Sequence, residues 1–238
     1  MERQIIFLAH VREDEPQQWQ EHHLEEHLRE VARLAGKFAA AFASSDWAYM
    51  AGLWHDLGKY RIAFQRYLRT ASGYNPNAHI ETASGRVDHS TAGALYAEQT
   101  LGSAGRVLAY LIAGHHAGLP DYETADTGRA ALKSRLQEGR VKGYLDETLQ
   151  AAIPADILTP QPLSSRPIGD RDGFHLWVRL LFSCLTDADF LDTEHFMIPT
   201  QAALRIDFPR VETLLTQFNA SMDALLTNRV PTPVDTIR

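Results

Sequence analysis

Apolar residues recur at intervals of three and four along most of this 238-residue chain, the spacing that places them on one side of an α-helix. The pattern is clearest in residues 21–43 and in a second segment that starts near Asp46, a favourable helix N-cap, and is closed by Gly58. Alternation of apolar and polar residues, which indicates a β-strand, is found only in Gln4 to Ala9. The sequence therefore predicts an all-α fold.

The same pattern predicts the remaining helices and their connections. A polar stretch over 70–88 predicts a long loop, and Asp88 can cap the helix that follows it. Four prolines between 154 and 170 predict an irregular connection. We expect a single domain over residues 1–238, with its core at about 20–195 and a C-terminal helix at about 209–227. The other expected helices cover 61–69, 89–101, 103–114, 127–138, 143–152 and 174–188.

The composition excludes several classes of protein. No apolar run approaches the ~18 residues of a membrane span, so no membrane association is expected. The N-terminal residues lack the apolar length of a signal peptide, and the single cysteine, Cys184, excludes an intramolecular disulfide framework. Both features predict a cytoplasmic protein. The net charge of −7 argues against non-specific coating of nucleic acid, but it is compatible with a nuclease whose metal ions supply positive charge.

Five segments each place histidine or aspartate at the end or edge of a predicted apolar helix. One such histidine is usually structural and hydrogen-bonded to the backbone. Burying five groups of this kind without compensation would cost several kcal/mol each, and divalent metal ions are the natural compensation. A carboxylate among them could bridge two ions about 3.5–4 Å apart. The segments are His27, His55-Asp56, His89, His115-His116 and Asp187.

Short motifs around these residues carry a family resemblance. The segment Ala51-Gly52-Leu53-Trp54-His55-Asp56-Leu57-Gly58-Lys59 resembles the signature of the HD metal-dependent phosphohydrolase superfamily, whose members are helical bundles with an H…HD…D ligand set. Four further segments are similar, in the same order, to the HD nuclease of CRISPR-associated Cas3 proteins. They are Phe64–Leu68, Asp88–Ala94, Gly114–Asp121 and Ser183–Asp189. The resemblance implies an HD-domain helical bundle.

This resemblance also implies two metal ions that share one carboxylate. One ion would be held by His27, His55, Asp56 and Asp187, and the other by Asp56, His89, His115 and His116. Because Asp189 and Asp192 lie near Asp187 on the same predicted helix, the family pattern and not the spacing selects Asp187. The resemblance implies that Lys59 faces the scissile phosphate and acts with Asp56 in catalysis. The alternative is that Lys59 is a solvated lysine after the end of the helix.

Six histidines match no ligand position and are expected to be surface or structural residues: His10, His22, His23, His79, His175 and His195. Of these, His10 and His23 are near enough in sequence to His27 to contact a metal ligand. A basic run formed by Lys133, Arg135, Arg140 and Lys142 is expected to be a solvated helix face rather than a contact to a phosphate backbone.

The resemblance implies a metal-dependent nuclease that cleaves DNA, preferentially single-stranded, in type I CRISPR interference. The sequence has no Gly-x-x-x-x-Gly-Lys-Ser/Thr loop for ATP phosphates, so the expected partners are a separate Cas3-type helicase and the RNA-guided Cascade complex. Five imidazoles and two carboxylates favour transition metals, Mn, Fe, Co or Ni, over Mg. Two alternatives stay open: an HD phosphohydrolase acting on a dNTP or cyclic nucleotide, and a metal-free interaction module of the effector complex.

Overall fold

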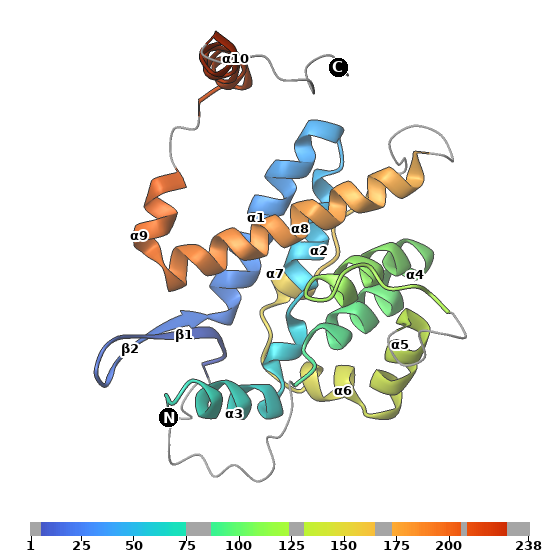
Figure 1. Ribbon diagram of the computed structural model, residues 1–238. Coiled ribbons are helices and arrows are strands. Elements are labelled where there is room, and N and C mark those ends of the chain that lie inside the picture. Colours follow the sequence, from blue (N-terminus) through green and yellow to red (C-terminus); the bar gives the residue numbers. More distant parts are fainter. Residues whose placement is uncertain (1–5, 75–86, 124–130, 165–172, 206–208, 228–238) are drawn as a thin grey trace. The chain divides into compact units, whose positions relative to one another are not determined.

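The computed structural model describes residues 6–74, 87–123, 131–164, 173–205 and 209–227 (Figure 1). The chain divides into two compact units, Met1–Pro199 and Thr200–Arg238. Helices make up nearly all of the regular structure in the described residues, so the predicted all-α fold is confirmed. None of these helices combines the length and the apolar composition needed to cross a membrane.

The first unit begins with an antiparallel hairpin of β1 (Leu8–Glu15) and β2 (Gln18–His23). The predicted helix over 21–43 is therefore too long at its start, because residues 21–23 pair with β1. The helices that follow are α1 (Leu24–Ala39), α2 (Ser45–Trp54), α3 (Ile62–Ala71), α4 (Ser90–Gly114), α5 (Leu132–Val141), α6 (Tyr144–Leu149), α7 (Ala155–Leu158) and α8 (Phe174–Met197), with 3₁₀ turns η1 (Ala40–Phe42) and η2 (Leu57–Tyr60). Then come α9 (Pro199–Ala202), a 3₁₀ turn (Ala203–Arg205) and α10 (Val211–Thr227).

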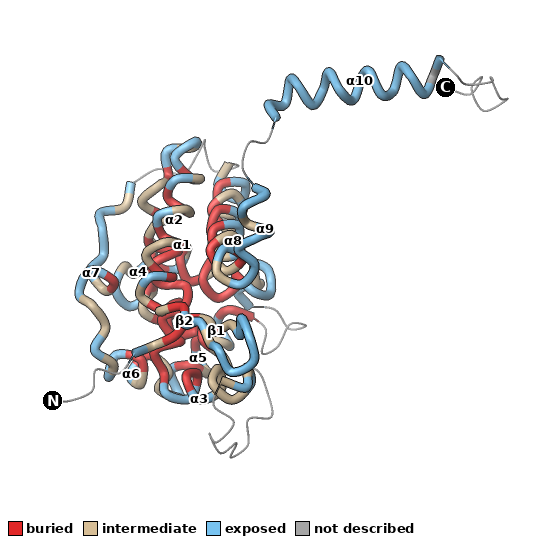
Figure 2. Tube along the Cα trace, turned by 90° about the vertical axis from the view of Figure 1, so that its left-hand side faces the viewer, coloured by how far each residue is buried: buried red, intermediate tan, exposed pale blue. Residues whose placement is uncertain are grey.

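Helices α1, α2, α4 and α8 surround the hydrophobic core of the first unit, whose buried segments are red in Figure 2. Two tryptophans are completely enclosed there, and each satisfies its indole N–H. Trp54 donates to the carbonyl oxygen of Ile157 at 2.8 Å, and Trp177 donates to Ser44 Oγ at 2.9 Å. These bonds let large aromatic side chains fill the core without an unpaired donor.

Gly58 has a different role from the predicted helix cap. Helix α2 already ends at Trp54, and Gly58 lies in the 3₁₀ turn η2. Its backbone N–H donates to the carbonyl oxygen of His89 at 3.0 Å, and a Cβ atom at this position would lie 2.2 Å from that oxygen. Only glycine permits this approach, which holds the segment after α2 against the start of α4.

Gln65 fastens the N-terminal hairpin to the first unit. Its side-chain amide accepts a hydrogen bond from the backbone N–H of Leu8 at 3.1 Å and donates to the carbonyl oxygens of Leu8 at 2.9 Å and Lys59 at 2.8 Å. The amide is buried, and its bonds join strand β1 to the turn that follows α2. Strand β1 therefore lies beside Lys59, whose ammonium donates to the carbonyl oxygen of Ala9.

Candidate metal centre

Asp56 lies at the centre of a group of histidines that come from different segments of the chain. Its two carboxylate oxygens face different neighbours. Oδ2 lies 3.4 Å from His27 Nε2 and 3.3 Å from His55 Nε2. Oδ1 lies 3.5 Å from Nε2 of His89 and 3.5 Å from Nε2 of His115. The carboxylate therefore divides the centre into two sides, each with its own histidines.

Hydrogen bonds from the opposite ring nitrogen fix the orientation of these histidines. Nδ1 of His55 donates to the carbonyl oxygen of Gly52 at 2.7 Å, and Nδ1 of His115 donates to that of Ile112 at 2.6 Å. A carbonyl can only accept, so Nδ1 carries a proton in both rings and Nε2 is the nitrogen directed at the centre. Imidazoles held in this way are the usual ligands of metal ions.

Several ring nitrogens and one carboxylate oxygen of the centre have no hydrogen-bond partner in the described part of the chain. Nε2 of His27, His55, His89 and His115 and Oδ1 of Asp56 are buried, and within that part they make no hydrogen bond. Leaving a buried polar atom unpaired costs about 1–3 kcal/mol. Five such atoms directed at one place form a donor set for a cation, so the residues present fit divalent metal ions.

The second carboxylate of the centre comes from Asp189 and not from Asp187. Oδ1 of Asp189 lies 3.4 Å from His27 Nε2 and 3.6 Å from His55 Nε2, whereas Asp187 is exposed and outside the centre. The prediction of Asp187 is therefore wrong in this structure. Two residues along α8 correspond to a turn of about 200°, so Asp187 and Asp189 face opposite directions.

We call the group around Asp56 Oδ2 the carboxylate-rich side; it contains His27, His55 and Asp189. Burial alone would lower the pKa of His55, but Asp56 and Asp189 outweigh it and raise this pKa to about 10. Burial would raise the pKa of Asp189, but His55 lowers it below the usual value. The imidazole and the carboxylates of this side therefore hold each other in their charged forms at neutral pH.

The group around Asp56 Oδ1 is the imidazole-rich side and contains His89, His115 and His116. One ligand atom from each of these residues and from Asp56 lies within 4.8 Å of the others. Burial lowers the pKa of His89 to about 4, and burial together with His115 lowers the pKa of His116 to about 3. These two imidazoles are neutral at pH 7 and already in the form that a metal ion requires.

Arg135 supports the imidazole-rich side from helix α5. Its guanidinium donates to the carbonyl oxygen of Ala113 at 2.5 Å, to Ser90 Oγ at 3.0 Å and to Asp88 Oδ2 at 3.3 Å. These acceptors lie next to His89 at one end of α4 and near His115 at the other. The expectation of a solvated helix face is thus wrong for Arg135, which connects the two segments that carry the histidines.

Asp88 also holds the start of α4, as the sequence predicts. Its carboxylate accepts the backbone N–H of Thr91 at 2.9 Å and the Thr91 hydroxyl at 2.7 Å. The neighbouring His89 donates from Nδ1 to the carbonyl oxygen of Val87 at 3.2 Å. His89 Nε2 is consequently left facing Asp56.

The N-terminal hairpin adds two histidines that the sequence interpretation assigned no ligand position. Nδ1 of His10 lies 3.1 Å from Nδ1 of His22, and Nε2 of His22 lies 3.5 Å from Asp192 Oδ2. The same Asp192 oxygen accepts a hydrogen bond from Nδ1 of His27 at 2.6 Å. Asp192 thereby orients a histidine of the carboxylate-rich side. Both His10 and His23 are expected near His27. The ring of His10 contacts the ring of His27, whereas Nδ1 of His23 lies 4.0 Å from Oε1 of Glu26.

The other unmatched histidines lie away from the centre or outside the described residues. His175 and His195 are exposed on α8, and His79 belongs to the part of the chain that the structure does not describe. His10, His22 and His27 also have ligand atoms within 4.8 Å of one another. The hydrogen bonds from His27 to Asp192 and between His10 and His22 already engage these rings.

Lys59 is buried rather than solvated. Its ammonium lies 2.7 Å from Asp56 Oδ2, donates to the carbonyl oxygen of Ala9 at 3.3 Å and lies 3.5 Å from His10 Nε2. The pKa of Asp56 is well below its usual value, because the charges of Lys59 and His55 outweigh the effect of burial. Lys59 therefore keeps the central carboxylate ionised.

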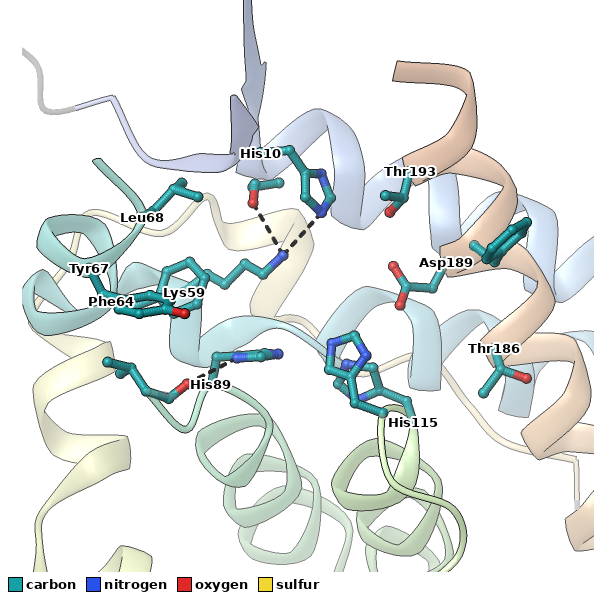
Figure 3. Close-up of a pocket in the computed structure, with 14 residues that line it drawn as sticks. His10, Lys59, Phe64, Tyr67, Leu68, His89, His115, Thr186, Asp189 and Thr193 are labelled. Atoms are coloured by element: carbon teal, nitrogen blue, oxygen red, sulfur yellow. Dashed lines mark hydrogen bonds between the residues drawn. The ribbon is translucent and has the colours of Figure 1, made fainter. Parts of the chain in front are cut away.

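The centre opens into a cavity of about 470 Å³ (Figure 3). Lys59, His10, Asp189 and the histidines of the imidazole-rich side form its polar wall. Apolar and aromatic residues complete the lining, with Phe64, Tyr67 and Leu68 on α3 and Phe190 on α8. The nitrogen of Lys59 points into the same space as the carboxylate of Asp189, as Figure 3 shows.

Comparison with known proteins agrees with this geometry. The family model described as "HD domain" matches residues 24–151, which is more than half of the chain. The matched range contains the histidines of both sides and Asp56, and it ends before α8, which supplies Asp189 and Asp192. No curated protein matches the sequence.

Proposed function

The chain belongs to the HD domain family, whose members are metal-dependent hydrolases, and on that premise we propose that it is a nuclease that cleaves single-stranded DNA. One observation carries the proposal. The two oxygens of Asp56 face two separate sets of imidazoles, and Asp189 and the imidazole-rich side line a cavity that also contains aromatic residues. A bridging carboxylate of this kind suits in-line displacement at phosphorus.

The residues of the two sides would hold two divalent ions, with Asp56 shared between them. When bound, such ions acidify a water molecule and neutralise the charge that develops on phosphate oxygens. Lys59 lines the cavity next to Asp56, so its ammonium can donate a hydrogen bond to a phosphate oxygen of the substrate. His10 lies on the other side of this ammonium and limits its movement.

The apolar part of the lining favours a substrate with a base next to the scissile phosphate. Phe64 and Tyr67 lie one helical turn apart on α3, with ring centroids 6.3 Å apart. Aromatic side chains next to a phosphate-binding group are typical of proteins that bind single strands, because every base has a face that can stack. A base pair cannot present that face, so an unpaired strand is the favoured substrate.

The partners belong to the same proposal. Separating a DNA duplex costs about 1–2 kcal/mol per base-pair step, and single-strand cleavage on duplex DNA needs another protein to supply this work. The motif resemblance points to type I CRISPR interference, with a separate Cas3-type helicase and the RNA-guided Cascade complex. Duplex degradation that requires this helicase and ATP is the expected result in a reconstituted assay.

The test compares substrates at one protein concentration. Single-stranded oligonucleotide, the matched duplex, dNTPs and cyclic nucleotides are incubated with Mn²⁺, Co²⁺, Ni²⁺ or Mg²⁺ after removal of bound metal. We expect cleavage of the single strand with the transition metals and little with Mg²⁺. Turnover of nucleotides without cleavage of the oligonucleotide would replace the proposal by the nucleotide phosphohydrolase alternative, which a cavity of about 470 Å³ could also accommodate.

A further inference from the structure

A second cavity, of about 570 Å³, lies outside the metal centre. It is formed by the second half of α4, the segment Leu119–Tyr122 and the first turns of α8. Two arginines and three aromatic residues give it its character, and we call it the stacking pocket. They are Arg106, Tyr110, Tyr122, Phe174 and Arg179.

Aromatic faces and cations are available together in the stacking pocket. The guanidinium carbon of Arg106 lies 5.6 Å from the centre of the Tyr122 ring, and the Tyr110 and Tyr122 ring centroids are 6.4 Å apart. Tyr122 and Phe174 are each 38% exposed, so a ligand can reach their rings. This combination suits a ligand that alternates flat rings with negative charges.

The charges of the pocket differ from the acidic balance of the chain as a whole. Arg179 is exposed and forms no ion pair among the described residues. Nε of Arg106 lies 3.4 Å from Oε1 of Glu98. This ion pair lies at the surface, so it contributes little stability and can open for an anionic ligand. Asp121 is the acidic residue of the lining, against two arginines. In a chain with a net charge of −7, two arginines beside exposed aromatic rings indicate an anionic ligand.

Helix α8 connects the stacking pocket with the metal centre. Arg179 lines the pocket, while Thr186 and Thr193 line the catalytic cavity. The three residues recur every seven positions and therefore lie on one side of the helix. Arg179 and Asp189 are ten residues apart, about 15 Å along the axis at 1.5 Å per residue. This separation suits a few nucleotides of an extended strand.

We infer that the stacking pocket binds a segment of single-stranded DNA that continues from the strand held at the metal centre. Bases would stack on Tyr122 and Phe174, and Arg106 and Arg179 would contact the flanking phosphates. The inference rests on the proposed nuclease function, because it gives that activity a second contact to its substrate. In this role, the residues of the stacking pocket determine the affinity for long strands and do not affect the rate of the chemical step.

The test measures binding and cleavage separately in the full-length protein. Binding of fluorescein-labelled dT20 is followed by anisotropy in EDTA, so that no strand is cut. The double variant Arg106→Ala/Arg179→Ala and the single variant Phe174→Ala should each weaken binding about tenfold. The double variant should also reduce the slope of log K against log salt by about 1.4, because about 0.7 is lost for each phosphate contact on a single strand.

Cleavage assays then distinguish a strand subsite from a general loss of folding. With Mn²⁺, the KM for dT20 should rise about tenfold in the variants, while hydrolysis of bis(p-nitrophenyl) phosphate, which is too small to reach the stacking pocket, should stay within about twofold of wild type. Arg33→Ala/Lys37→Ala removes the same charge from exposed positions of α1 and should leave dT20 binding unchanged.

The outcomes separate this inference from the proposed function. Variants that bind dT20 as tightly as wild type, or no more weakly than the α1 control, would overturn the stacking pocket even if the wild type cleaves DNA. Competition by dTMP as strong as by dT20 would also overturn it, since a mononucleotide site would then be present. Selective loss of dT20 binding in a protein that cuts no oligonucleotide with any metal would support the pocket and refute the nuclease.

Discussion

The carboxylate-rich and imidazole-rich sides of the metal centre share Asp56 but differ in their charge. On the first side, Asp189 joins Asp56 near His55, and the pKa of this histidine rises to about 10. On the second side, Asp56 is the only carboxylate among the described ligands, and the pKa of His89 falls to about 4. At neutral pH His55 is therefore protonated and His89 is neutral before a metal ion binds.

This difference shows that the charges around a buried imidazole decide its protonation state before a metal ion binds. Burial lowers the pKa of both His55 and His89 because it disfavours the charged ring. At His55, Asp56 and Asp189 together outweigh burial, whereas at His89 the charges of Lys59 and His115 act with burial against Asp56. A metal ion that binds His55 must displace a proton at neutral pH, whereas a metal ion that binds His89 need not.

The largest effect is expected from removing the residue that the two sides share. Asp56→Ala should lower nuclease activity about a thousandfold or more, because both ions lose a ligand and their common bridge. Elemental analysis should find neither ion at full occupancy, and circular dichroism should show an unchanged helical content. Activity near wild type would contradict the bridged arrangement and with it the division into two sides.

Asp189→Ala should affect only the carboxylate-rich side. We expect about hundredfold weaker binding of one ion and an unchanged affinity for the other, measured by titration with Mn²⁺ against a chelator. Asp187→Ala is the matched control, since that carboxylate is exposed two residues away on α8, and it should stay within twofold of wild type. If Asp187→Ala weakened metal binding and Asp189→Ala did not, Asp187 would be the ligand, and the position of Asp189 next to His27 and His55 would be refuted.

Arg135→Ala should weaken the imidazole-rich side without touching a ligand. The variant loses the bonds that connect the segments of His89 and His115, so metal affinity there should fall about thirtyfold. Metal titration should show one weakened ion, while the ion on the carboxylate-rich side binds normally. Arg33→Ala, an exposed arginine on α1, controls for the charge; an equal effect in both variants would argue against a positioning role for Arg135.

The pH dependence of metal affinity should distinguish the two sides in the unmodified protein. Below its raised pKa of about 10, His55 is protonated, so affinity on the carboxylate-rich side should fall up to about tenfold for each unit by which the pH decreases. His89 and His116, with lowered pKa values of about 4 and 3, stay neutral above about pH 5, so these two ligands should release no proton when an ion binds. Calorimetry in buffers of different ionisation enthalpy checks this through the protons released. Equal proton release for both ions would contradict the comparison.

The helices could be predicted from the sequence because their signals are local. Apolar spacing of three and four indicates α1, α2 and α8, and Asp88 caps α4 as expected. The change of direction at Gly102, which has a φ of 59°, lies where the sequence separates two helices at 101 and 103. The histidines and Asp56 could likewise be selected in advance, because several of them border apolar stripes that must be buried.

The three-dimensional structure alone decided which side chains meet. Asp187 and Asp189 have the same chemistry and lie two residues apart, and only the rotation of α8 against α1 places Asp189 next to His27. Contacts of Arg135 and of His10 join residues far apart in sequence, through a helix and a hairpin whose positions no local pattern contains. Periodicity determines which face of an element is buried, because it depends on neighbours along the chain. The identity of the partner depends on packing between elements, and this is why the sequence predicted the ligand types and the fold, whereas the structure determined the arrangement of the centre.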